Sequence, residues 1–566
     1  MEQAARQLNL KAYTLAQFLS ASGHYGGRNQ RYHLSDRPAE DTARTVIVDE
    51  ASMLTEEMLA ALLQAIKGIY RLILVGDPQQ LPPIGPGRPF VDIVARLRPE
   101  NIHNIPIRVG PGYAELMVRR RQQIEAGREG RKDLQLAEWF SGRPLGPGED
   151  EVFETISVGS SKHVDFIQWD TPDEFQKRLL EVLVEELVDV DDLDDARGFG
   201  VSLGGERFGN SVYYNAKWKD KPGAASKAEV WQILSPVRGL THGVTEINRL
   251  IHKQFKSQTI TSARRLPWLR KIPKPMGEEE IVYGDKVINV INHHRSGRKR
   301  VFPQEGAAGY IANGEIGMVV GQFKGKNSKT PGPPWALKVE FSSQPGYQYQ
   351  FTESDFDRED AGNYLELAYA LTVHKAQGSE FGLVILVLPN PCFLLSRELI
   401  YTALTRQRDR VIIMHQGSRS ELKKYASDVW SDTAMRFTNL FEKPNMVLVK
   451  GYAASEDRFL EERLIHRTCD GTPVRSKSEV IIYDRLVNKG LEPIYEKALT
   501  LGGVTKYPDF TIEDEDAGIN YYWEHCGLLH DAGYRERWER KLKWYRDHDI
   551  LPYGEGGGDE GILNAC

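Results

Sequence analysis

Two short apolar runs near the start of the chain are each followed at once by carboxylate and amide side chains. These side chains are Asp49 and Glu50 after residues 45–48, and Asp77 and Gln80 after residues 72–75. Residues 56–69, between the runs, have the apolar spacing of a helix, so the pattern predicts strand, helix, strand. Because ligands bind outside the carboxyl ends of parallel strands, we expect the four side chains to share one crevice.

The types of these side chains suggest nucleotide hydrolysis. An Asp at a strand end can hold Mg²⁺ through water, an adjacent Glu can polarise the attacking water, and a Gln on the next strand can sense the γ-phosphate. The alternative is that Asp49 and Glu50 only begin a helix, as an N-cap and an acidic first turn. The second run continues as GDPQQLPP from residue 76, and this continuation favours hydrolysis.

The same residues carry a family resemblance. The stretches 49–52 (DEAS) and 76–83 (GDPQQLPP) resemble motifs II and III of the RecD-like branch of superfamily 1 helicases, P-loop motors that translocate on single-stranded DNA. The resemblance implies ATP and Mg²⁺ as cofactors, with the metal held by Asp49 and the nucleotide contacted by Asp77. It also implies that Glu50 activates water, that Gln80 senses the γ-phosphate, and that single- or double-stranded DNA is the partner.

One part of such a motor is missing from the sequence. Phosphate loops (Walker A) follow the pattern G-x-x-x-x-G-K-[ST], and no stretch of the sequence matches it. Residues 1–19 resemble the segment that follows motif Ia, in which Thr14 would lie near DNA. The phosphate loop would then precede Met1. We therefore expect a fragment of a longer protein, a mispredicted start, or half of a split motor whose partner supplies the loop.

Three later stretches resemble further motifs. Residues 115–122 (ELMVRRRQ) resemble motif IV, whose arginine reaches the γ-phosphate; Arg121 matches it best, and the alternative is a solvated basic helix face. Residues 367–381 resemble motif V, and residues 399–408 resemble motif VI, in which Arg406 matches an arginine finger. Within motif V the resemblance assigns the nucleotide to Gln377, Gly378 and Glu380, and DNA to His374 and Lys375.

The expected fold is α/β, with two RecA-like P-loop motor domains. The first domain is partial and covers residues 1–150, and a connection of helices and loops follows at 151–228. The second motor domain comprises residues 229–282 and 353–447. Arg238 lies in a stretch that resembles the opening of the second motor domain, and we expect it to contact DNA.

Residues 283–352 contain short apolar runs separated by glycine turns, a pattern typical of a small β-barrel. Its position matches the SH3-type barrel inserted in the second motor domain of these helicases. The loop at 293–300 is strongly basic, and Arg298 and Arg300 are candidates for contacts with DNA phosphates. A merely solvated loop is equally compatible with the sequence.

Residues 448–566 predict a separate α/β domain whose order of helix, strand, hairpin strands and helix resembles PD-(D/E)XK, restriction-endonuclease-like nucleases. The resemblance implies a Mg²⁺ site formed by Asp509 and Glu524, with Glu479 completing the shell and Lys541 as the catalytic lysine. Lys541 is a substitute on the following helix, because Cys526 stands where the family has its lysine. The alternative is a non-cutting DNA-binding relic. A glycine-rich turn near residue 556 suggests that the last strand of this domain is lost.

Composition narrows the class of protein. A net charge of −6 is not typical of a passive DNA-coating protein, whereas a motor with a local nucleic-acid channel can be acidic overall. The four cysteines lack metal-site or disulfide spacing and no apolar run is long enough to span a bilayer, so we expect a cytoplasmic protein.

The expected function is an ATP-dependent, 5′-to-3′ single-stranded DNA helicase with a Mg²⁺-dependent nuclease, acting in DNA repair, recombination or defence. Two alternatives remain: a non-hydrolysing DNA-binding scaffold that delivers the nuclease, and an RNA helicase.

Overall fold

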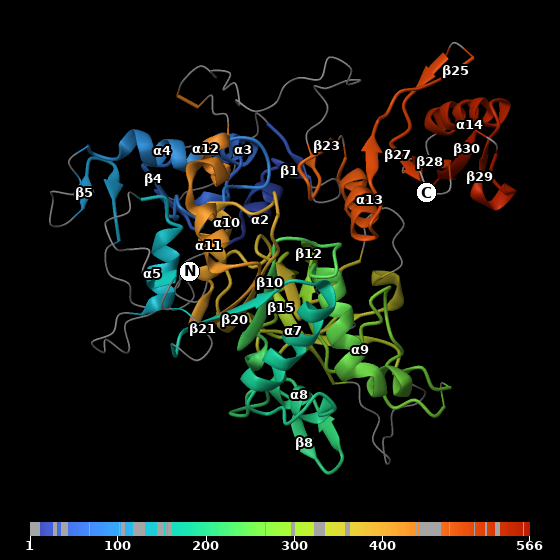
Figure 1. Ribbon diagram of the computed structural model, residues 1–566. Helices are drawn as coiled ribbons and strands as arrows, with labels where there is room; N and C mark the ends of the chain where they lie inside the picture. The colour runs from blue at the N-terminus through green and yellow to red at the C-terminus, as the bar shows by residue number, and fades with distance from the viewer. Residues whose placement is uncertain are drawn as a thin grey trace. The chain divides into compact units, whose positions relative to one another are not determined.

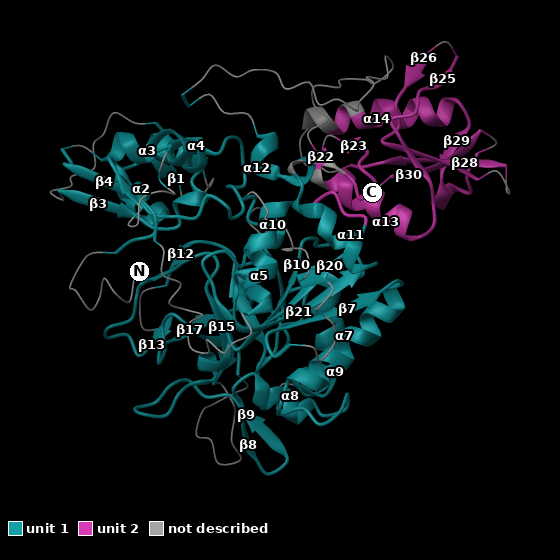
Figure 2. Ribbon diagram, turned by 60° about the vertical axis from the view of Figure 1, so that its left-hand side comes forward, with its two compact units in different colours: residues 1–390, 395–446 teal, residues 391–394, 447–566 magenta. Residues whose placement is uncertain are grey.

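A computed structural model gives the fold in two compact units (Figure 2). Unit 1 comprises residues 1–390 and 395–446, and unit 2 comprises residues 391–394 and 447–566. The structure describes residues 12–26, 31–34, 44–66, 68–100, 102, 108–116, 131–143, 152–153, 156, 161–266, 268–295, 300–321, 334–356, 363–436, 440–441, 466–474, 476–502, 504–514, 518–526, 532–558 and 560–565. Within these ranges, none of the helices combines the length and apolar character needed to cross a membrane.

The amino-terminal part of unit 1 contains the predicted strand, helix and strand. They are β3 (Thr45–Val48), α3 (Glu56–Ala65) and β4 (Arg71–Leu74), and the two strands pair in parallel. Helix α4 (Pro89–Leu97) follows and contributes to a core made of Ala51, Leu54, Leu59 and Phe90. The carboxyl ends of both strands therefore lie at one edge, as the sequence predicts.

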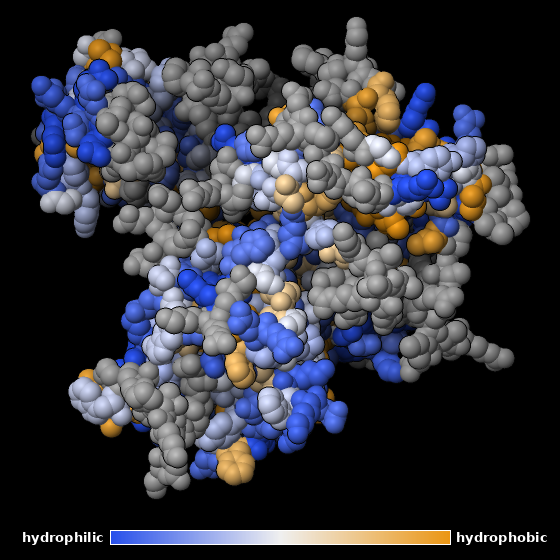
Figure 3. All heavy atoms as spheres, turned by 180° about the vertical axis from the view of Figure 1, so that it is seen from behind, coloured by the Kyte–Doolittle hydropathy of each residue, from blue (hydrophilic) through white to orange (hydrophobic). Residues whose placement is uncertain are grey.

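Neither strand is buried on both of its faces, although continuous apolar runs are typical of such strands. Val48 and Leu74 pack against the core, but Ile47, which points to the opposite face of β3, is 51% exposed. Seen from behind, this part of the molecule also displays hydrophobic side chains at its surface (Figure 3). The apolar runs therefore predicted the positions of these strands but not how deeply their side chains are buried.

The second motor sheet has five parallel strands in the order β19-β10-β20-β21-β7. Their bounds are β7 (Val164–Trp169), β10 (Trp231–Ser235), β19 (Ala370–Thr372), β20 (Phe381–Leu388) and β21 (Gln407–Gln416). Helices α7 (Pro172–Glu186), α9 (Val244–Ala263) and α10 (Arg397–Leu404) lie beside it (Figure 1). Parallel strands alternating with helices form the α/β arrangement of a RecA-like motor domain.

Strand β7 corrects the expectation for residues 151–228, which was a connection of helices and loops. The run VDFIQW pairs along its full length with β21 and forms an edge of the five-stranded sheet. Its two polar residues, Asp165 and Gln168, broke the apolar run that marks a buried strand. The sheet therefore recruits a strand from a segment that the motifs do not cover.

Residues 286–367 form most of a six-stranded antiparallel sheet in the order β13-β17-β16-β15-β11-β18. Its strands are β11 (Lys286–Asn289), β13 (Val301–Phe302), β15 (Ile316–Val320), β16 (Leu337–Phe341), β17 (Gln348–Phe351) and β18 (Leu365–Leu367). The predicted short strands are thus present, and closure into a barrel stays a prediction. Because β18 precedes β19 by two residues, the motif V stretch begins where the two sheets join.

Shorter elements complete unit 1. They are α2 (Leu15–Ala21), β1 (Tyr25–Gly26), β2 (Arg31–Tyr32), β5 (Val109–Gly110), β6 (Tyr113–Ala114), α5 (Lys132–Trp139), α8 (Ala196–Ser202), β8 (Glu206–Phe208), β9 (Ser211–Tyr213), β12 (His293–His294), β14 (Tyr310–Ile311), α11 (Arg419–Lys423) and α12 (Asp432–Met435).

Unit 2 is built on a mixed five-stranded sheet in the order β24-β27-β28-β30-β29. Its main elements are α13 (Lys477–Asn488), β24 (Pro493–Tyr495), β27 (Phe510–Asp514), β28 (Ile519–Glu524), α14 (Ala532–Asp547), β29 (Ile550–Pro552) and β30 (Gly561–Ala565); β22 (His466–Arg467) pairs with β23 (Pro473–Val474), and β25 (Leu499–Leu501) with β26 (Val504–Lys506). The expected loss of the last strand is wrong, because β30 lies in parallel between β28 and β29.

Candidate functional site

The loop after β3 carries the predicted pair of acids. Asp49 is exposed, and Glu50 adopts a left-handed backbone conformation with a φ of 53°. A non-glycine residue in this region stores strain, and such residues are frequent at functional sites. The loop also lies tightly against the end of β4. The Ala51 amide donates to Val75 O at 2.8 Å, and a Cβ atom on Gly76 would come within 2.9 Å of the Ser52 nitrogen.

The loop after β4 (residues 77–88, here the 77–88 loop) is organised by Asp77. The Asp77 carboxylate accepts hydrogen bonds from the Gln79 amide at 3.0 Å and from Gln80 Nε2 at 3.3 Å. It also accepts one from the hydroxyl of Tyr401, on helix α10, at 3.0 Å. The Gln80 Oε1 atom is buried and has no hydrogen-bond partner among the described residues, so it remains available as an acceptor.

Two further hydrogen bonds connect the 77–88 loop to the stretches that resemble motifs V and VI. The backbone amide of Leu81 donates to Thr402 Oγ1 at 2.8 Å, and Gln377 Nε2 donates to the Leu81 carbonyl oxygen at 3.2 Å. Leu81 and Thr402 are both buried. Residues that lie 296 to 324 positions apart in the sequence are therefore in direct contact through this loop.

Two arginines that the sequence did not single out hold the distal part of the same loop. Arg436, just after α12, donates through Nη1 to the carbonyl oxygens of Pro83, Gly85 and Gly87 at 2.8, 2.7 and 3.0 Å. Arg88 donates to the Thr433 carbonyl oxygen at 2.6 Å. No motif covers Arg436, so only the tertiary structure could have identified it. Tyr401 and Thr402, by contrast, lie inside the motif VI stretch.

Arg406, the predicted arginine finger in the motif VI stretch, is 5% exposed and contacts the motif V stretch. It donates from Nε to the Thr402 carbonyl oxygen at 3.2 Å and from Nη1 to the Ser379 carbonyl oxygen at 3.5 Å. The turn that holds Gln377 and Glu380 passes through Gly378, whose φ of +79° favours glycine. The role of Arg406 toward ATP stays a prediction.

The remaining predicted residues of unit 1 are distributed more widely. Thr14 is the N-cap of α2 and accepts a hydrogen bond from the Gln17 amide at 3.2 Å. Arg300 is half exposed and lies 3.6 Å from the Asp355 carboxylate. His374 lies in the turn after β19. Arg121 and Arg298 lie outside the described residues.

Arg238 and Lys375 share one carboxylate. Arg238 Nη2 lies 3.1 Å from Glu366 Oε2, and Lys375 Nζ lies 2.6 Å from the same oxygen. Arg238 follows β10, Lys375 follows β19, and these two strands are parallel neighbours. The structure therefore brings two of the predicted DNA-binding cations together.

In unit 2 the structure brings together Asp509, Glu524 and Lys541. Asp509 precedes β27 and accepts a hydrogen bond from the His525 amide at 2.7 Å. Glu524 ends β28, where its Oε1 atom lies 2.5 Å from Lys541 Nζ and accepts a hydrogen bond from the Tyr545 hydroxyl at 2.6 Å. Strand pairing and helix α14 thus place two acids and a lysine in one cluster.

Burial favours the neutral, protonated forms of the two carboxyl groups in this cluster. Desolvation raises the pKa of Glu524 to about 7, with a further contribution from the Asp509 carboxylate, while Lys541 opposes the shift. Burial also raises the pKa of Asp509. Both effects are those expected for two neighbouring carboxylates that are partly compensated by one ammonium group.

The fit of this cluster to a metal is partial. Carboxylate oxygens are the ligands that Mg²⁺ prefers. The third predicted ligand, Glu479, accepts hydrogen bonds from the Tyr495 hydroxyl at 2.6 Å and from the Ser476 hydroxyl at 2.9 Å. Across the part of the chain that the structure describes, no group of three or more His, Cys, Asp and Glu side chains could hold a metal ion. The Mg²⁺ site therefore stays a prediction.

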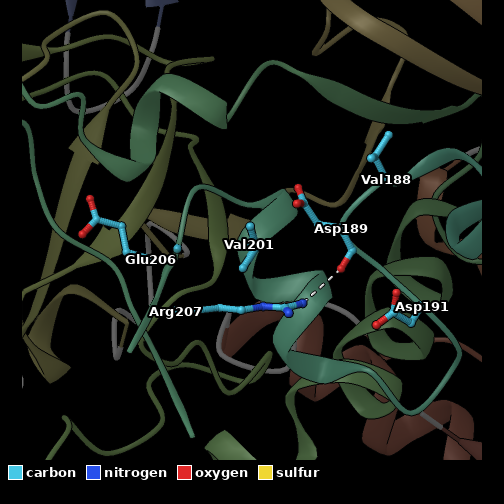
Figure 4. Close-up of a pocket in the computed structure, with 7 residues that line it drawn as sticks. Val188, Asp189, Asp191, Val201, Glu206 and Arg207 are labelled. Carbon is cyan, nitrogen blue, oxygen red and sulfur yellow. Dashed lines mark hydrogen bonds between the residues drawn. The ribbon is translucent and has the colours of Figure 1, made fainter. Parts of the chain in front are cut away.

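An open pocket in unit 1 lies apart from these groups (Figure 4). It is formed after α7 and around α8 and β8, where Arg207 donates to the Asp189 carbonyl oxygen at 3.3 Å. Its lining includes Asp189, Asp191 and Glu206 and none of the predicted site residues. This acidic surface offers no cradle for a nucleotide.

Comparisons with known proteins agree with the motifs. Residues 1–125 match the model of an AAA domain, and residues 367–414 match that of a UvrD-like helicase C-terminal domain. The first match contains the loops after β3 and β4, and the second contains Gln377, Tyr401 and Thr402, which contact the loop after β4.

Three curated relatives are longer than this chain. The "ATP-dependent RecD2 DNA helicase" of Deinococcus radiodurans is 26% identical over 72% of this chain and 41% of its own length. The "RecBCD enzyme subunit RecD" of Mycolicibacterium smegmatis is 24% identical over 74% of this chain and 57% of its own length. The "Uncharacterized protein MJ1519" of Methanocaldococcus jannaschii is 27% identical over 87% and 38%. The part that this last match leaves uncovered is smaller than unit 2, so the match extends into unit 2.

A solved structure of Bacteroides Pif1 bound to ssDNA aligns with 73% of this chain and 81% of its own chain, at 13% identity and a TM-score of 0.33. That score is too low to support a conclusion. In its motifs, in the two family models that it matches and in its curated relatives, this chain is similar to RecD-like superfamily 1 helicases.

Proposed function

We propose that this chain is the motor part of an ATP-dependent helicase that moves 5′-to-3′ on single-stranded DNA, in repair, recombination or defence. The observation that carries the proposal is the contact of the 77–88 loop with Gln377, Tyr401 and Thr402. These hydrogen bonds connect the 77–88 loop, which follows β4, to segments of the second motor domain. A change at the nucleotide can reach the DNA-facing turns through these bonds.

Each residue of this site has a distinct task in the proposed reaction. Asp49 would hold Mg²⁺ through water, and the ion would neutralise charge on the phosphates. Glu50 polarises the attacking water, and the buried amide of Gln80 registers whether the γ-phosphate is present. Arg406 and Arg121 stabilise the negative charge that develops during phosphoryl transfer.

Directional movement tests this proposal most specifically. The full chain, with any phosphate-loop partner, is incubated with ATP and a single-stranded oligonucleotide that carries streptavidin on a 3′- or a 5′-biotin. Movement in the proposed direction displaces streptavidin from the 3′ end only, and omission of ATP abolishes the displacement. Displacement from the 5′ end would reverse the polarity. Failure at both ends, with DNA still bound, would favour the non-hydrolysing scaffold; an RNA oligonucleotide in parallel tests the RNA helicase.

We further propose that unit 2 is a Mg²⁺-dependent DNA nuclease. Asp509 and Glu524 would hold the metal and Glu479 would complete its shell, while Lys541 would stabilise the charge that develops on the scissile phosphate. The support is the cluster of Asp509, Glu524 and Lys541 at the ends of neighbouring strands. Lys541 comes from α14, which compensates for Cys526 at the position of the family's lysine.

Cleavage assays separate this nuclease from a DNA-binding relic. Labelled single- and double-stranded DNA is incubated with the full chain and Mg²⁺, beside Asp509→Asn and Lys541→Ala. Both variants are expected to lose cleavage, whereas Lys543→Ala, an exposed lysine on the same helix, retains it. DNA binding without cleavage by the unaltered chain would show that unit 2 is a relic.

A further inference from the structure

Two cations at the carboxyl edge of the second motor sheet converge on one carboxylate. Arg238 Nη2 lies 3.2 and 3.1 Å from the two oxygens of Glu366, and Lys375 Nζ lies 2.6 Å from Glu366 Oε2. The Arg238 side chain is 57% exposed, whereas Lys375 and Glu366 are each 26% exposed. The cluster is therefore open to solvent on the arginine side.

The fold brings these groups together from three strands. The turns after β10 and β19 carry the cations, and the strands are neighbours, with Ser235 opposite Thr372. Glu366 lies at the centre of β18 in the antiparallel sheet, where it pairs with Ile288. A second acid, Glu279, accepts a hydrogen bond from the Leu367 amide at 2.6 Å and also interacts electrostatically with Glu366 and with both cations.

The Glu366 carboxylate binds both cations with the kind of contact that a phosphate would make. Arginine and lysine bind carboxylates and phosphates through the same charge-assisted hydrogen bonds. Glu366 accepts hydrogen bonds from both cations at once, and the cations in turn lower the pKa of Glu366 against the effect of its burial. A nucleic-acid phosphate can engage this pair only if it displaces or shares the carboxylate.

We propose that Glu366 is an internal competitor for the phosphate-binding site of Arg238 and Lys375. The inference rests on the proposed function, because the phosphate belongs to the backbone of single-stranded DNA. Displacing Glu366 costs part of the binding free energy, so each contact at this point is weaker than the two cations alone would make it. A motor that must release and rebind the backbone at every step benefits from such a contact.

The Glu366→Gln substitution tests the competition, because glutamine keeps the shape and removes the charge. Binding of a labelled single-stranded oligonucleotide to the full chain is followed by fluorescence anisotropy between low and moderate salt. We expect Glu366→Gln to bind about 5- to 10-fold more tightly at low salt, the change that about 1 kcal/mol produces. The slope of log K against log salt should steepen by about 0.7, the value for one additional neutralised phosphate on a single strand.

Two further variants make the result specific. Lys375→Gln in the Glu366→Gln background should abolish most of the gain. Glu280→Gln, which removes a carboxylate paired with the exposed Arg264 elsewhere in unit 1, should leave the affinity unchanged. Thermal unfolding of each variant confirms that the fold is retained.

Three outcomes would overturn the inference. Weaker binding by Glu366→Gln would mean that the carboxylate positions the cations for DNA. Unchanged affinity and salt slope would mean that Arg238 and Lys375 do not contact the backbone. In both cases the proposed motor function would survive. Absence of single-strand binding by the unaltered chain and the variant would instead remove the DNA-binding part of the proposed function together with this inference.

Discussion

In unit 1 the 77–88 loop contacts segments that lie 296 to 324 residues away in the sequence, whereas unit 2 assembles its two acids and its lysine from residues 509–541. The contacts of the 77–88 loop with Gln377, Tyr401 and Thr402 are hydrogen bonds with at least one neutral partner, and two of them are made by the backbone of Leu81. Those of unit 2 are made by partly buried carboxylates and an ammonium group. The first arrangement can change when its two motor domains move, whereas the second is fixed by strand pairing.

This difference predicts the kind of change to which each site is most sensitive. A site held by hydrogen bonds between distant loops should lose coupling when a single hydroxyl is removed, with little loss of stability. A site of buried carboxylates should respond to pH, because protonation changes the cost of burial. Three substitutions separate these behaviours.

The largest effect is expected from Glu50→Gln. If Glu50 polarises the attacking water, the variant should lower DNA-stimulated ATP turnover by about 10²-fold or more, while the affinity for single-stranded DNA is retained. Steady-state ATP hydrolysis measures this effect. Glu57→Gln serves as the control, because Glu57 is exposed on α3 close by. An equal loss in both variants would assign the effect to the fold of this segment and not to catalysis.

The next largest effect concerns the stability of unit 2. The folded-state pKa of Glu524 is raised from 4.5 to about 7, so its contribution to stability is complete below pH 4.5 and is lost as the pH rises through 7. Glu524→Gln should remove this dependence, which amounts to at most on the order of 3 kcal/mol. Urea unfolding at several pH values, followed by tryptophan fluorescence, measures it. Glu539→Gln, an exposed acid on α14, should keep the slope of the unaltered chain.

The smallest effect is expected from Tyr401→Phe, which removes the hydroxyl that donates to Asp77. Stability should fall by about 1 kcal/mol, the usual contribution of one hydrogen bond. The effects of Tyr401→Phe and Asp77→Asn should not add in a double-mutant cycle, because both remove the same contact. Tyr70→Phe, an exposed tyrosine, is the control. Additive effects would mean that this bond does not couple the two motor domains.

The sequence predicted the strands that are continuous apolar runs. β3 and β4 both lie where such runs end in polar residues, because this pattern marks strands with chemistry at their carboxyl ends. It missed β7, whose polar Asp165 and Gln168 interrupt the run. The sequence also could not predict that Ile47 is exposed, because the burial of a side chain depends on which elements pack on each face of the strand.

The residues of the candidate sites, like the strands, could be predicted from the sequence only in part. Residue types identified Asp77 and Gln80, the resemblance to motif V identified Gln377, and the structure places all three around Leu81. The contacts of Arg436 with the 77–88 loop and of Glu366 with two cations could not be predicted, because they join residues of no local pattern. Such contacts are determined by the docking of whole elements and leave no periodic signal in the sequence.

The measurement that tests the central claim most directly is ATP hydrolysis by the full chain, with and without single-stranded DNA and with any phosphate-loop partner present. The contacts of the 77–88 loop with the motif V and motif VI stretches predict turnover that single-stranded DNA stimulates and that Glu50→Gln abolishes. A chain that binds single-stranded DNA but shows no stimulated turnover under these conditions would contradict the claim. It would leave a DNA-binding scaffold whose only enzymatic activity to be sought is the nuclease.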